Sequence, residues 1–73
     1  MNQDIVNVLI QDATAKANLA ILNIKVLLDN PVGVADHPNI AETIQGQLDE
    51  IATQQGRIAV LANVFKEKDD KEN

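Results

Sequence analysis

Proline placement is the feature that most constrains the fold of this 73-residue chain. Both prolines lie in residues 30–38, together with one of the three glycines, so the long stretches on either side carry no proline. Pro31 disfavours helix at the residue before it, and Gly33 can adopt positive φ in a turn. The segment therefore predicts a break between two long helices.

The second helix is expected to begin at the end of this segment. Asp36 or His37 can cap it, and Pro38 is tolerated in a first helical turn because its missing N–H is not needed there. The boundaries predicted are a helix at about residues 3–29, a connector at 30–37 and a helix at about 38–67. Residues 68–73 are expected to form a disordered polar tail, which leaves residues 1–67 as one domain.

The connector is short enough to force the two helices antiparallel. Hydrophobic residues make up 45% of the chain with Phe65 as the only aromatic, a composition that suits helix packing better than a β-sandwich. The predicted fold class is all-α, an antiparallel two-helix hairpin.

The first helix has an apolar surface too broad for one partner. Placed at 100° per residue, its polar side chains form one narrow strip and most of the remaining circumference is apolar. The chain has no cysteine and a single histidine, so disulfides and a metal cage within one chain cannot stabilise so small a domain. We therefore expect homo-oligomerisation, as a dimer or a larger assembly, to build a helical bundle.

The main subunit interface is predicted where the first helix begins and the second one ends, because apolar residues point in several directions there. The residues assigned to this interface are Ile5, Val6, Leu9, Ile10, Val60, Leu61, Val64 and Phe65.

Polar residues interrupt the apolar faces about halfway along the helices. Asp12 and Lys16 are four residues apart and can pair along the first helix, and Gln55 interrupts the apolar stripe of the second at about the same level. The three predict a polar layer inside the bundle. Such a layer either sets the register of the helices or forms a ligand site between subunits.

The remaining candidate residues favour structural roles. Gly56 lies on a small-residue face that permits close helix approach, whereas Gly46 lies on the polar face without an evident role. Asp36, His37 and Glu42 form too small a group for acid–base or metal chemistry in a lone hairpin. We expect no enzymatic activity, no cofactor and no metal site.

Charge bears on the choice of partners. The formal net charge is −5, and three of the six basic residues lie in the last eight positions, which opposes binding to nucleic acid or to an anionic membrane. No uninterrupted apolar run approaches the length of a transmembrane helix, and the N-terminus lacks the basic start of a signal peptide. A soluble, cytoplasmic protein is expected.

About half of the chain carries a resemblance. Residues 32–40 (Val-Gly-Val-Ala-Asp-His-Pro-Asn-Ile), followed by the apolar segments 48–52 and 57–61, resemble small uncharacterised proteins of tailed phages that infect marine cyanobacteria. The resemblance implies a small protein made in the cytoplasm of a bacterial host, where phages use such proteins to bind or block host components. It brings no known activity and no site residues.

Three functions are consistent with these observations. The first is an oligomeric interaction protein that binds a host or phage protein. The second is a binder of a small ligand such as a signalling nucleotide, with sites between subunits, although nucleotide sites favour basic and aromatic groups that this chain lacks. The third is a minor virion or assembly component.

Overall fold

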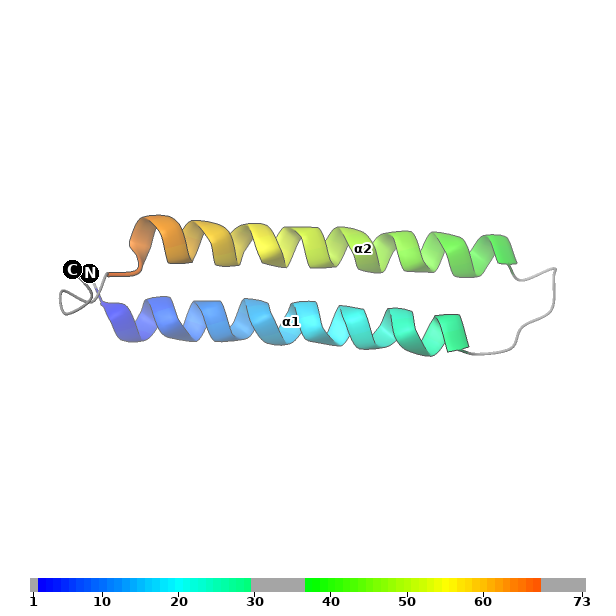
Figure 1. Ribbon diagram of the computed structural model, residues 1–73, viewed down its shortest axis with the longest axis horizontal. Coiled ribbons are helices and arrows are strands. Elements are labelled where there is room, and N and C mark those ends of the chain that lie inside the picture. The colour runs from blue at the N-terminus through cyan, green and yellow to red at the C-terminus, as the bar shows by residue number, and fades with distance from the viewer. Residues whose placement is uncertain (1, 30–36, 68–73) are drawn as a thin grey trace.

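The computed structural model describes residues 2–29 and 37–67 of the chain. They form two long helices, α1 (Gln3–Asp29) and α2 (His37–Val60), and a π-helical segment, η2 (Leu61–Phe65), that continues α2. Figure 1 shows α1 and α2 lying side by side and running in opposite directions. The prediction of an all-helical hairpin of two packed helices is confirmed. The predicted connector and tail lie outside the described residues, apart from His37, which is the first residue of α2.

Local sequence sets both helix starts. The side-chain oxygen of Asn2 accepts hydrogen bonds from the backbone N–H groups of Asp4 (3.0 Å) and Ile5 (3.2 Å), which caps α1. Asp4 also places a negative charge in the first turn, where the helix dipole favours it. In α2, Pro38 occupies the first turn.

The seam between the helices is built from small residues. In α1 it follows steps of three and four residues, and its most buried members are Val6, Ala13, Ala17 and Ala20, which are only 2–7% exposed. Alanine allows two helices to approach toward the short end of the usual 8–10 Å interaxial range. The small buried side chains thus come from α1, and the facing seam of α2 supplies half-buried isoleucines, the half-buried Gln47 and the buried Gln54.

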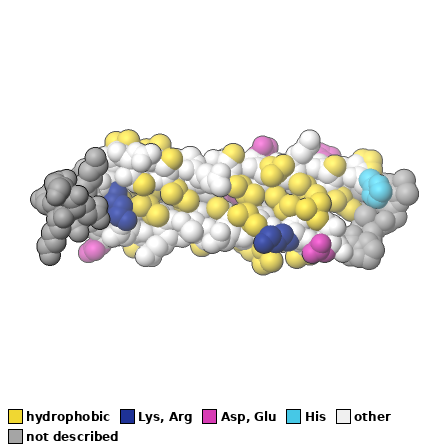
Figure 2. Space-filling view, in the orientation of Figure 1, with side chains coloured by type: hydrophobic (Ala, Val, Ile, Leu, Met, Phe, Trp, Pro, Cys, Tyr) yellow, Lys and Arg dark blue, Asp and Glu magenta, His cyan; other side chains and the backbone are white. Residues whose placement is uncertain are grey.

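The overall shape is a rod of 56 × 20 × 16 Å with a radius of gyration of 16.9 Å, against about 11 Å for a compact domain of this length. A rod of two helices covers only one side of each helix. Figure 2 shows hydrophobic side chains along most of the length of one face, over both helices, with few charged groups among them.

The end of the rod at which α1 begins and η2 finishes, here called the open end, is held by one side chain. The Gln3 amide donates to the backbone carbonyl of Phe65 (3.2 Å) and accepts from the backbone N–H of Glu67 (3.0 Å). The N–H of Lys66 bonds to the carbonyl of Leu61 (2.8 Å), five residues earlier, as a π-helical turn requires. Gln3 therefore ties the two ends of the hairpin together.

Candidate interaction site

A shallow groove lies between α1 and α2 toward the open end. Its volume is about 540 Å³, and its lining consists of Leu9, Asp12, Ala13, Gly56, Arg57, Val60 and Leu61. Two of these residues are charged and the rest are apolar or glycine. The groove is thus an apolar trough with one carboxylate and one guanidinium on its walls.

The groove exists because the side chains at its base are small. Ala13 is almost fully buried, and a Cβ added at Gly56 would meet no atom within 4 Å beyond the adjoining backbone of its own helix. Larger apolar side chains, Leu9 and Val60, are about half exposed on the walls. This arrangement leaves apolar surface open to a partner that could fill the trough.

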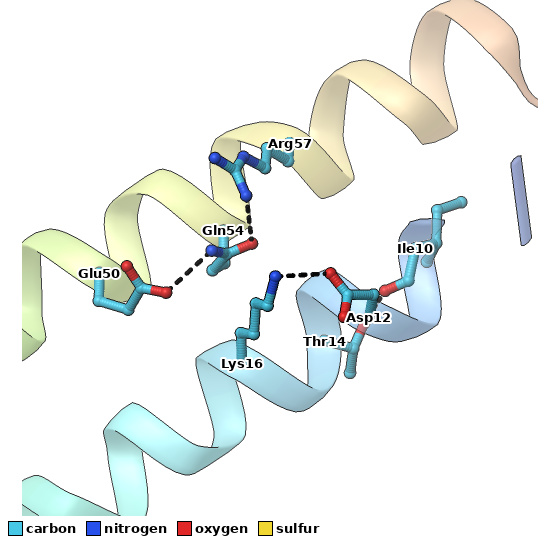
Figure 3. Close-up of polar contacts among 7 residues, drawn as sticks. All are labelled: Ile10, Asp12, Thr14, Lys16, Glu50, Gln54 and Arg57. Atoms are coloured by element: carbon cyan, nitrogen blue, oxygen red, sulfur yellow. Dashed lines mark hydrogen bonds and ion pairs between the residues drawn. The ribbon is translucent and has the colours of Figure 1, made fainter. Parts of the chain in front are cut away.

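Polar side chains from both helices gather beside the groove (Figure 3). On α1, Lys16 Nζ lies 2.9 Å from Asp12 Oδ2, and both side chains are about half exposed. On α2, the Gln54 amide donates to Glu50 Oε1 at 2.9 Å and accepts from an Arg57 N–H at 3.4 Å. The cluster combines two acids, two bases and an amide, so its net charge is zero.

The predicted polar layer has two of its three members together. Asp12 and Lys16 form the expected pair, whereas Gln55 is exposed in the hairpin. The polar residue of α2 that lies in the seam is Gln54, which is 2% exposed. In the hairpin, α2 turns Gln47 and Gln54 toward α1 and leaves Leu48 and Gln55 exposed. The polar layer of Asp12, Lys16 and Gln55 inside a larger bundle stays a prediction.

The residues assigned to the subunit interface fall into two groups. Val6 is buried and Ile10 and Leu61 are half buried in the hairpin, so these three help to hold α1, α2 and η2 together. The other five are exposed: Ile5, Leu9, Val60, Val64 and Phe65. Only this second group is available to another molecule in the form shown.

Some contacts had no sequence indication. Asn23 donates a hydrogen bond across the helices to Gln47 (3.3 Å), beside a second, smaller hollow lined by these two residues with Val26, Leu27 and Thr43. The Gln3 contacts with Phe65 and Glu67 join residues more than sixty positions apart. Glutamine and asparagine side chains carry no periodicity that would place them opposite a particular partner.

Within the described ranges, no group of three or more His, Cys, Asp or Glu side chains lies close enough to hold a metal ion. Glu42, considered with Asp36 and His37 as a candidate group, is exposed on α2. His37 is exposed at the start of the same helix, and Asp36 lies outside the described residues.

The length and composition of α1 also bear on membranes. By length and composition alone, α1 is long and apolar enough to cross a bilayer, although charged residues interrupt it. In the hairpin, 22% of its most apolar 18-residue stretch is buried. Mostly buried core helices of soluble proteins and signal sequences near an N-terminus meet the same criteria. An exposed polar strip that includes Asn7, Gln11 and Asn18 runs along the helix.

Comparison with known proteins gives no relative for this hairpin. No protein-family model matches the chain, and neither the curated proteins nor the solved structures provide a significant match.

Proposed function

We propose that this chain is a non-enzymatic interaction protein that self-associates through its helix faces and binds a partner protein in the groove near the open end. The observation that supports the proposal is that small apolar residues are buried while large apolar residues are exposed. Among the described residues, the buried apolar side chains are three alanines and a valine, while eleven large apolar side chains are 40–68% exposed. Exposed apolar surface on this scale is typical of protein-binding surfaces.

The physical reason is the free energy of apolar hydration. Burying one Leu, Ile, Val or Phe side chain contributes about 1.5–3 kcal/mol, and the hairpin gains little of this from its alanine seam. A domain of this size already has a narrow stability margin. Association with other helices supplies the missing burial.

The context is that of a phage-encoded protein acting in the cytoplasm of its host, as the resemblance of residues 32–40 and the following helix implies. The partner is then a host or phage protein that presents an apolar helix or edge. Arg57, on the α2 wall of the groove, gives such a partner a positive group to pair with.

Affinity capture from host extract, with the tagged chain and two variants, tests this proposal. Val60→Glu places a charge on the groove wall, whereas Ala59→Glu places the same charge on an exposed neighbouring position outside it. We expect one defined protein to be retained by the wild type and by Ala59→Glu and to be lost with Val60→Glu. Equal capture by all three, or capture of nothing, would contradict the role of the groove.

Binding of a small molecule is the second candidate function, and the groove itself favours it. Its volume falls within the range of about 300–1,000 Å³ that is typical of ligand sites, and Arg57 could contact an anionic group. A panel of nucleotides tested for shifts in melting temperature, with Arg57→Gln as the control, decides this point. A shift of several degrees that Arg57→Gln removes would support ligand binding, and a flat panel would exclude the nucleotides tested.

A further inference from the structure

A second apolar stripe runs along α1 outside its seam with α2, and two of its members, Asp12 and Val26, also border the hollows between the helices. It follows the same steps of three and four residues as the seam with α2, and its apolar members are Ile5, Val8, Ala15, Leu19, Leu22 and Val26. All six are exposed, the five large ones at 55–60%. Asp12 completes the series, and we call the seven residues the outer stripe.

The spacing of the outer stripe specifies the kind of partner. Apolar residues repeating at an average of 3.5 positions form the seam that a second helix packs against in a coiled coil. From Ile5 to Val26 the stripe extends over about 32 Å of helix, at 1.5 Å per residue. The partner element is therefore a helix of similar length.

The accessible surface of the chain gives the area to be covered. It is 5641 Å², whereas a compact monomer of 7.9 kDa exposes about 4,400 Å². The excess of about 1,200 Å² is comparable with the roughly 800 Å² that each partner contributes to a stable interface. Pairing along the outer stripe covers part of this excess.

We propose that the occupant of the outer stripe is α1 of a second copy of this chain, packed antiparallel about a twofold axis between residues 13 and 14. In this register Ile5 meets the partner's Leu22, Val8 meets the partner's Leu19, and Asp12 meets the partner's Ala15. Symmetry repeats each contact. Large apolar residues then pair with large ones, and the carboxylate faces the smallest residue of the stripe, which leaves it room.

Charge favours this direction and register. The partner's Lys16 comes within one residue of the level of Asp12, and Asp4 and the partner's Lys25 lie at nearby levels on the same flank. A parallel pair in register would place Asp12 against the partner's Asp12 within the seam, and like charges at such a position are unfavourable. Only the antiparallel arrangement pairs opposite charges at both positions.

The resulting assembly has the two α1 helices at its centre and one α2 on each outer side. Each α1 then covers its inner seam with α2 and its outer stripe with the partner. Gly56 and Val60, which form the α2 side of the groove, stay uncovered. This inference rests on the proposed self-association and specifies its surface and register.

Single-cysteine crosslinking tests the register, because the natural chain has no cysteine. Val8→Cys and Leu19→Cys alter exposed positions and leave the hairpin seam intact. The two variants are mixed in equal amounts, allowed to exchange subunits and mildly oxidised. We expect disulfide-linked dimers in which residue 8 of one chain is joined to residue 19 of the other. Up to about half of the chains should be crosslinked, because random pairing of the two variants makes half of the dimers mixed. Each variant alone should give few disulfides.

A second pair of variants tests the surface without cysteine. Leu19→Glu puts a charge in the outer stripe, and Asn18→Glu puts the same charge on the neighbouring polar strip. Light scattering with refractive-index detection should show at least ~100-fold weaker association for Leu19→Glu and none of this loss for Asn18→Glu. Helical content should be equal in the two variants.

The possible failures are distinguishable. A dimer in which each cysteine variant crosslinks to itself, or in which the mixture gives no disulfide, would overturn the antiparallel α1 pair and leave self-association intact. A wild-type monomer would overturn both proposals. A monomer that binds phosphatidylcholine vesicles through the same stripe would assign it to a lipid surface and equally reject the dimer.

Discussion

The two helices of the hairpin use their apolar residues in opposite ways. α1 buries alanines against α2 and exposes five large aliphatic side chains outside this seam, whereas α2 places two glutamines in the seam and has Leu48 as the one large aliphatic exposed between His37 and Arg57. A helix that has two separate apolar stripes belongs in the centre of an assembly. A helix with one such stripe belongs at its edge, so the comparison assigns α1 to the interior and α2 to the surface.

The largest expected effect comes from enlarging the seam of α1. Ala17→Leu should lower the free energy of unfolding by about 1–3 kcal/mol, because the close approach of the helices leaves no space for three more carbons. Ala59→Leu, at an exposed position of α2, should change it by less than about 0.5 kcal/mol. Urea unfolding followed by circular dichroism measures both, and equal effects would contradict the alanine seam.

The two glycines of α2 should tolerate an added methyl group. Gly46→Ala and Gly56→Ala should each raise the free energy of unfolding by about 1 kcal/mol, because an added methyl meets no atom within 4 Å beyond the adjoining backbone of its own helix and alanine favours the helix. Thermal melts measure the gain. Since only Gly56 lines the groove, Gly56→Ala should also weaken partner binding, with Gly46→Ala as the matched control. Loss of stability in Gly56→Ala alone would indicate that a second chain packs on this glycine.

The contact that joins the two helix ends should have a smaller effect. Gln3→Ala removes two exposed hydrogen bonds, to Phe65 and Glu67, and should cost about 0.5–1 kcal/mol. The amide of Glu67 should exchange with solvent several-fold faster, as measured by NMR hydrogen exchange. Gln11→Ala, on the polar strip of the same helix, serves as the control, and equal exchange in both variants would show that Gln3 does not hold the end.

The smallest effect belongs to the Asp12–Lys16 pair. A double-mutant cycle in the Leu19→Glu background should give a coupling of about 0.3–0.5 kcal/mol, the usual value for exposed pairs four residues apart on a helix. In the wild-type background the coupling should be larger, since the partner's Lys16 also approaches Asp12. The same value in both backgrounds would place the partner's Lys16 elsewhere.

Much of the architecture was predictable from the sequence because its determinants are local. The prolines at 31 and 38 mark a break between helices whatever the tertiary contacts are, and the first helix was expected at about 3–29 and is found at Gln3–Asp29. The breadth of the apolar surface of that helix was also evident from periodicity. These features depend on backbone chemistry and helical geometry alone.

The rotation of the helices about their own axes was less accessible. An analysis of helical periodicity assigns large aliphatic residues to the inward face. It therefore favoured Leu48 as a core residue and Gln55 as the polar residue that interrupts the apolar stripe of the second helix. The hairpin instead selects the face on which alanines allow close approach, and this brings Gln54 into the seam. Whether a helix packs through its alanine-rich face or through the face with large aliphatic residues depends on which partner helices are present. The sequence of one chain does not specify those partners.

Native mass spectrometry of the wild-type chain across a range of concentrations tests the central claim that α1 is an interior helix most directly. It also avoids ultraviolet detection, which is poor for a chain with no Trp or Tyr. If α1 lies in the interior, we expect a closed dimer of twice the 7.9 kDa chain mass that persists on dilution to low micromolar concentration. A 7.9 kDa monomer at every concentration would contradict it, because the outer stripe of α1 would then have no second copy to cover it.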